Sequence, residues 1–66
     1  MRVKEFLETL NEDCRENLWS IDIGEEIYDF DDISKEDLEK EIKEWYFKCY
    51  IDGQMFVQRL IIETVK

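Results

Sequence analysis

The amino-acid sequence predicts one small α+β domain over residues 1–66, with elements in the order α-β-β-α-β-β and a four-stranded, largely antiparallel sheet flanked by two helices. Three observations predict it. Apolar residues recur at helical spacing in two separate stretches. Segments rich in aromatic and β-branched residues surround the two glycines, Gly24 and Gly53. A chain of 66 residues has room for one thin core only.

The first helix is expected over residues 3–10. Four apolar residues fall at i, i+3, i+4 and i+7 and therefore share one helix face: Val3, Phe6, Leu7 and Leu10. The stretch "NEDCREN" that follows interrupts this pattern and is predicted to be a polar loop.

A β-hairpin is expected in "LWSIDIGEEIYDFDD", with Gly24 and Glu25 as a two-residue turn of type II′. This turn predicts five cross-strand pairs: Ile23 with Glu26, Asp22 with Ile27, Ile21 with Tyr28, Ser20 with Asp29, and Trp19 with Phe30. Side chains alternate across a strand, so one face, expected to be the core face, carries Trp19, Ile21, Ile23, Tyr28 and Phe30, and Ile27 falls on the other. Ser20, Asp22, Asp29 and Asp31 are expected on the outer face.

The second helix is expected over residues 34–44. Ser34 is a favourable N-cap, and Asp37 stands at the position of the acid in a capping box. Leu38, Ile42 and Trp45 then continue an inward stripe at helical spacing.

Residues 45–66 are open to two interpretations. The helical stripe extends to Cys49, which allows one long helix over residues 34–50. Aromatic and β-branched residues on both sides of Asp52-Gly53 favour a second hairpin, which is our prediction. Its helix-facing residues would be Phe47, Cys49, Ile51, Phe56, Leu60 and Ile62. Its opposite face would carry Tyr46, Tyr50, Met55, Val57 and Ile61 beside Lys48 and Arg59.

Residue types suited to catalysis are scarce. The chain has no His, two Cys and two Gly, which disfavours a zinc site, a nucleophile–base pair and a glycine-rich phosphate loop. A calcium loop starting at Asp29 fails at Ile33, Ser34 and Lys40, where an oxygen ligand, a glycine and a bidentate Glu are needed. We therefore expect a protein with no enzymatic activity, no metal and no cofactor.

Negative charge is the dominant feature of the composition. Eighteen acids and nine bases give a net charge of −9, and residues 21–44 alone carry eleven acids and three bases, or −8. Such a chain repels nucleic acid and anionic membranes and attracts proteins with a basic surface. The acidic face predicted to bind such a partner consists of Asp22, Glu25, Asp29, Asp31, Asp32 and Glu36. The alternative is that these acids only keep the protein soluble.

A second candidate surface is apolar. Tyr46, Tyr50, Met55, Val57 and Ile61 make one face of the second hairpin unusually hydrophobic for a surface in contact with water. This face is predicted to bind a partner protein or a second copy of the chain, unless a helix covers it.

The order of these features resembles small acidic proteins encoded by phages and prophages of Gram-positive bacteria. The resemblance rests on "VKEFLETL", "GEEIYDF", "DISKEDL", "EIK" and a "DG" hairpin ending in "LIIE"; the longer final hairpin and the extra aromatic residues depart from that pattern. Some proteins of this kind inhibit host defence, among them anti-CRISPR proteins that act as nucleic-acid mimics. The resemblance carries no binding residue over to this chain.

The expected function is therefore inhibition by protein binding. The acidic face would block the basic nucleic-acid-binding surface of a host defence enzyme, such as a CRISPR effector, in the cytoplasm of the host bacterium. Two alternatives remain open. One is an accessory or adaptor protein that assembles through its apolar strand face, and the other is an antitoxin-like neutraliser of a basic toxin.

Overall fold

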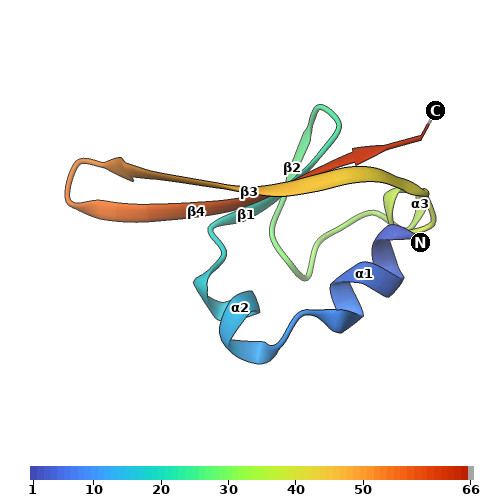
Figure 1. The fold of residues 1–66 in the computed structure, drawn as a ribbon, viewed down its shortest axis with the longest axis horizontal. Helices are drawn as coiled ribbons and strands as arrows, with labels where there is room; N and C mark the ends of the chain where they lie inside the picture. The colour runs from blue at the N-terminus through green and yellow to red at the C-terminus, as the bar shows by residue number, and fades with distance from the viewer. Residues whose placement is uncertain (66) are drawn as a thin grey trace.

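The computed structural model describes residues 1–65 and confirms a small α+β fold (Figure 1). Its elements are α1 (Val3–Thr9), α2 (Glu12–Asn17), β1 (Ser20–Ile23), β2 (Glu26–Tyr28), α3 (Lys35–Leu38), β3 (Ile42–Asp52) and β4 (Met55–Thr64). The four strands form one sheet in the order β2-β1-β4-β3. Two of its pairings are antiparallel, and the central pairing of β1 with β4 is parallel, so the sheet is mixed.

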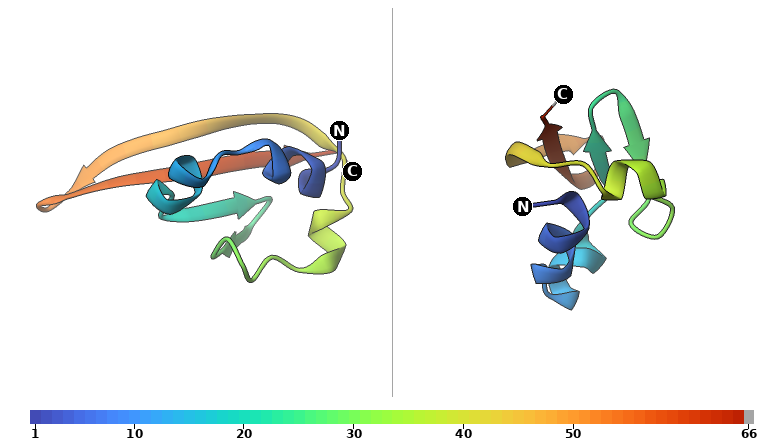
Figure 2. Two further views of the ribbon diagram at one scale, coloured as in Figure 1. Left: turned by 90° about the horizontal axis from the view of Figure 1, so that it is seen from below. Right: turned by 90° about the vertical axis from the view of Figure 1, so that its right-hand side faces the viewer.

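The molecule has two layers, with α1 and α2 on one side of the sheet (Figure 2). The core lies between them and is built from Val3, Phe6 and Leu7 of α1, Ile21 and Ile23 of β1, and Leu60 and Ile62 of β4. Since β3 and β4 are more than twice as long as β1 and β2, their hairpin extends as an arm past the helices (Figure 1). The opposite face of the sheet has no helix over it (Figure 2).

The first hairpin pairs as predicted next to its turn. Gly24 has a φ of 62°, and within residues 1–65 only glycines have a positive φ. The cross-strand pairs of β1 with β2 are Ile23–Glu26, Asp22–Ile27 and Ile21–Tyr28. The two outer pairs are absent because β2 ends at Tyr28. Asp29 and Asp31 therefore lie in an irregular segment rather than on a strand, and Trp19 is exposed rather than in the core.

The second helix is much shorter than predicted. Ser34 does cap it, since its hydroxyl accepts a hydrogen bond from the Asp37 amide, but α3 ends at Leu38 instead of residue 44. The backbone groups of residues 40–42, just beyond α3, form hydrogen bonds with residues near both ends of the chain. Val3 N donates to Lys40 O, Ile42 N donates to Met1 O, and Val65 N donates to Glu41 O. A helix through these residues would forfeit all three bonds, so β3 begins at Ile42.

The predicted polar loop "NEDCREN" contains a helix. Asn11 is its N-cap and accepts a hydrogen bond from the Cys14 amide, and Glu12 and Asp13 stand in the first turn, where acids are favourable. Because α2 buries no residue, it has no apolar stripe, and the absence of that stripe is why hydrophobic periodicity missed it.

The second hairpin is a pair of strands, which rules out a helix over residues 34–50. Its partition into two faces is as predicted, since Phe47 pairs with Leu60 and Tyr46 with Ile61. The turn is Gly53-Gln54 rather than Asp52-Gly53, because Asp52 pairs with Met55. Two residues predicted to face the helices, Ile51 and Phe56, are 75% and 69% exposed because the arm carries them past the helices.

Candidate functional site

An acidic surface is formed where α2 meets the segment that follows β2. Glu12, Arg15 and Glu16 of α2 line a shallow depression together with Phe30 and Asp31. The segment turns back on itself here, since Asp32 N donates a hydrogen bond to Asp29 O at 3.1 Å. We define the acidic surface as the six exposed acids of these two stretches: Glu12, Asp13, Glu16, Asp29, Asp31 and Asp32.

Arg15 holds the two stretches together. Its Nη2 donates a hydrogen bond to the carbonyl oxygen of Leu7 at 3.0 Å, which ties α2 to α1. Its guanidinium also lies over the ring of Phe30, 4.9 Å from the centroid, a distance at which a cation and an aromatic face attract. Arg15 is thus partly buried between the two stretches, and its guanidinium is engaged by Leu7 and Phe30.

The acidic surface keeps its negative charge uncompensated. The ion pairs within residues 1–65 use Asp22, Asp37, Glu39 and Glu41, and none of the six acids of the acidic surface takes part. A concentration of like charge without partners raises the local potential and attracts a basic protein surface. This arrangement suits binding to a cationic partner better than chemistry.

The six acids predicted to bind a partner do not form one surface. Asp29, Asp31 and Asp32 belong to the acidic surface. Glu25 lies in the turn between β1 and β2, and Glu36 is in the first turn of α3. The three acids of α2 were not predicted, although the sequence Asn-Glu-Asp is a typical helix start.

Asp22 lies on the helix-free face of the sheet. One of its oxygens accepts a hydrogen bond from the Ser20 hydroxyl at 2.9 Å, and the other contacts Arg59 Nη1 at 3.4 Å. Its charge is therefore used within the fold, and it does not serve as a free phosphate substitute.

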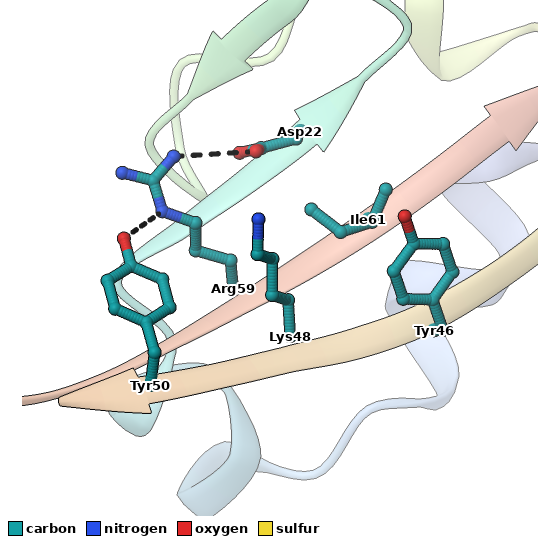
Figure 3. Close-up of a pocket in the computed structure, with 6 residues that line it drawn as sticks. All are labelled: Asp22, Tyr46, Lys48, Tyr50, Arg59 and Ile61. Atoms are coloured by element: carbon teal, nitrogen blue, oxygen red, sulfur yellow. Dashed lines mark hydrogen bonds and ion pairs between the residues drawn. The ribbon is translucent and has the colours of Figure 1, made fainter.

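The predicted apolar face is more polar than expected at its centre. Tyr46, Tyr50 and Ile61 line a depression of about 420 Å³ together with Asp22, Lys48 and Arg59 (Figure 3). Arg59 Nε donates to the Tyr50 hydroxyl at 3.0 Å, and this bond is the main reason that the pKa of Arg59 is raised. Of the other predicted members, Met55 is at the arm's end, and Val57 is buried at 3% exposure, so Val57 offers no contact area.

The end of the arm exposes three large apolar side chains close together. Ile51, Phe56 and Met55 are 75%, 69% and 52% exposed and lie beside the turn at Gly53. Ile51 and Phe56 pair across the two strands on one face, and Met55 lies on the other. Met55 was predicted to belong to the apolar contact surface, whereas Ile51 and Phe56, which are more exposed, were not.

Within residues 1–65 no group of three or more Cys, Asp or Glu side chains is arranged to hold a metal ion. In the same part of the chain, no helix has the length and apolar character needed to cross a membrane. Comparison of the chain with protein-family models, with curated proteins and with solved structures finds no match.

Proposed function

We propose that the protein is a non-enzymatic inhibitor that is encoded by a phage or mobile element and acts in the cytoplasm of the bacterial host. In this proposal it occupies the basic nucleic-acid-binding surface of a host defence enzyme, such as a CRISPR effector. Its acidic surface takes the place of the phosphates.

The observation that carries this proposal is the uncompensated charge of the acidic surface. Six exposed acids lie on two adjoining stretches, while the nearby Arg15 is engaged by Leu7 and Phe30. Adjacent phosphates of a DNA strand are about 3.4 Å apart along the helix axis. Segment 29–32 carries three carboxylates in four consecutive residues, which is a charge density of the same order.

Charge reversal tests the proposal directly. The double variant Asp29→Lys/Asp31→Lys replaces two negative charges of the acidic surface by two positive ones, a change of +4 in net charge, without touching the core. The immobilised wild-type protein should retain a nucleic-acid-binding enzyme from a nuclease-treated bacterial lysate at low salt and release it at high salt. Duplex DNA added to the wash should displace the same enzyme, and the double variant should not retain it.

A matched control comes from the other side of the molecule. Glu44 and Glu63 are exposed and pair across β3 and β4, so Glu44→Lys/Glu63→Lys makes the same change in net charge away from the acidic surface. This control should retain the enzyme about as well as wild type. Equal loss in both double variants, or a partner that DNA does not displace, would contradict mimicry at the acidic surface.

A second candidate function has its own observation in its favour. The exposed arm residues Ile51 and Phe56 suit an adaptor that assembles with a partner through apolar contact, with the acids only maintaining solubility. In that case Asp29→Lys/Asp31→Lys would leave binding intact, salt would weaken it little, and Phe56→Asp would abolish it.

A further inference from the structure

Two cations face each other on the helix-free side of the sheet. Lys48 of β3 is the direct cross-strand partner of Arg59 of β4 (Figure 3). Like charges placed directly opposite on neighbouring strands are destabilising. The chain has nine basic and eighteen acidic residues, so a basic residue is more often expected opposite an acidic one than opposite another base.

Of the two cations, only Arg59 has polar partners within residues 1–65. Arg59 uses Nε to bind the Tyr50 hydroxyl and Nη1 to contact Asp22. Its Nη2 makes no hydrogen bond within residues 1–65, and Lys48 takes part in no ion pair there. Tyr50 and Asp22 therefore fix the orientation of the guanidinium, whose unpaired Nη2 points away from Lys48 (Figure 3), and the Lys48 ammonium is left free for an anion.

The surroundings of this cation pair are aromatic and apolar. Tyr46 and Tyr50 stand two residues before and after Lys48 on the same strand face, and Ile61 is the cross-strand partner of Tyr46. All these side chains line the depression of about 420 Å³ (Figure 3). A planar ring bound against Tyr46 and Ile61 would lie next to an anion held by Lys48.

We propose that this depression is a binding site for a small phosphorylated ligand with a planar ring, of the class of a nucleoside monophosphate. The phosphate is bound by Lys48 Nζ, and the base packs on Tyr46 and Ile61. A charge-assisted hydrogen bond from Lys48 to an anion relieves the repulsion between the two cations. The net charge of −9 selects a small ligand over a nucleic-acid strand, because a polyanion is repelled by the whole molecule.

Titration with AMP, followed in amide ¹H–¹⁵N correlation spectra of the full chain, tests the site. AMP should give saturable shifts at residues 46–50 and 59–61. Inorganic phosphate should shift the amides near Lys48 and Arg59 more weakly, and adenosine those near Tyr46 and Ile61. Sodium chloride at matched ionic strength controls for screening. Shifts that are linear in AMP, or scattered over the surface, would overturn the proposal, and so would tighter binding of a single-stranded oligonucleotide than of AMP.

The variant Lys48→Gln separates ligand binding from a purely structural role. Removing one of two opposed cations should raise the thermal midpoint of the free protein. The same change should weaken AMP binding about tenfold or more, as expected for a lost hydrogen bond between charged groups. The thermal midpoint of the variant should then no longer rise with added AMP.

Lys43→Gln is the matched control, because Lys43 is an exposed lysine of the same strand and lines a different depression with Lys40 and Glu63. It should leave AMP binding unchanged. If Lys48→Gln binds AMP within about twofold of wild type, or if both variants lose binding equally, the site assignment is wrong.

Discussion

The phenol of Tyr28, at the end of β2, donates a hydrogen bond to the carboxylate of Asp37 in α3. Asp37 is 6% exposed, and it also pairs with the Lys40 ammonium at 2.7 Å. This contact joins the first hairpin to α3, which is too short to be stable by itself. The acidic segment between β2 and α3 is thus anchored at both ends.

The Tyr28–Asp37 contact predicts a dependence of stability on acidic pH. The Lys40 ammonium, and next the Tyr28 hydroxyl, hold the pKa of Asp37 below its ordinary value of 3.8. The unfolded chain therefore takes up a proton at higher pH than the native state does. The stabilisation is complete above about pH 4 and is lost as pH falls through the lower, native pKa.

Asp37→Asn provides the comparison that isolates this effect. It should lower the free energy of unfolding by about 1–3 kcal/mol at neutral pH, because charged hydrogen bonds are lost in a buried place. Urea unfolding measured across the acidic range should show the two proteins converging as pH falls. Curves that stay parallel down to strongly acidic pH would show that the Asp37 charge contributes nothing.

Arg15 should determine whether the acidic segment stays docked on α2. Arg15→Gln removes the bond to the Leu7 carbonyl and the contact with Phe30, and we expect a loss of about 1–2 kcal/mol in unfolding free energy. Amide exchange at Phe30 and Asp32 should accelerate more than exchange in β4. Glu16→Gln, an exposed change on the same helix, should alter stability by less than about 0.5 kcal/mol. Uniform acceleration throughout the chain would mean that Arg15 acts on global stability only.

The elements that were predictable from the sequence are those specified by a local signal. Gly24 supplies the positive φ that a two-residue turn needs, and the register beside that turn follows from it. The Ser34 cap is equally local. The end of α3 is not, because it depends on bonds from Val3 and Val65, which lie far away in the sequence.

The candidate site was predictable in part for the same reason. Three of its acids are consecutive or nearly so, and their charge is visible in the sequence. Their neighbours Glu12 and Glu16 are brought there by Arg15 through a tertiary contact that no sequence spacing predicts. Asp22 was predicted to belong to the partner-binding acidic face because strand alternation fixes its side of the hairpin. Its pairing with Arg59 arises from the parallel contact between β1 and β4, which the hairpin pattern does not show.

Gly53 should be required for the arm's turn. Its φ is 65°, in the region that L residues rarely adopt, and an added Cβ would meet no atom within 4 Å. The cost of Gly53→Ala is therefore backbone strain alone, and we expect about 1–2 kcal/mol in unfolding free energy. A synthetic chain with D-alanine at position 53, which accepts positive φ, should retain wild-type stability in chemical denaturation. Equal destabilisation by both enantiomers would indicate a steric cause instead.

Substitution at the end of the arm should change stability far less than substitution in the core. Phe56→Asp changes a side chain that is 69% exposed, so unfolding free energy should move by less than about 0.5 kcal/mol. Leu60→Ala, four residues along the same strand, empties a fully buried position and should cost about 2–5 kcal/mol. Both are measured by chemical denaturation.

Phe56→Asp is also the variant that tests apolar assembly. Val57→Asp is unsuitable for that purpose, because a charge at a position with 3% exposure would unfold the protein and abolish binding for a trivial reason. Light scattering over a range of concentrations measures the outcome. The single chain has a mass of 8.1 kDa. If the arm joins two copies, the wild type should approach twice this mass, and Phe56→Asp should remain at the mass of the single chain. A wild type that stays monomeric at every concentration would exclude self-assembly through the arm, and a dimer unaffected by Phe56→Asp would place the contact elsewhere.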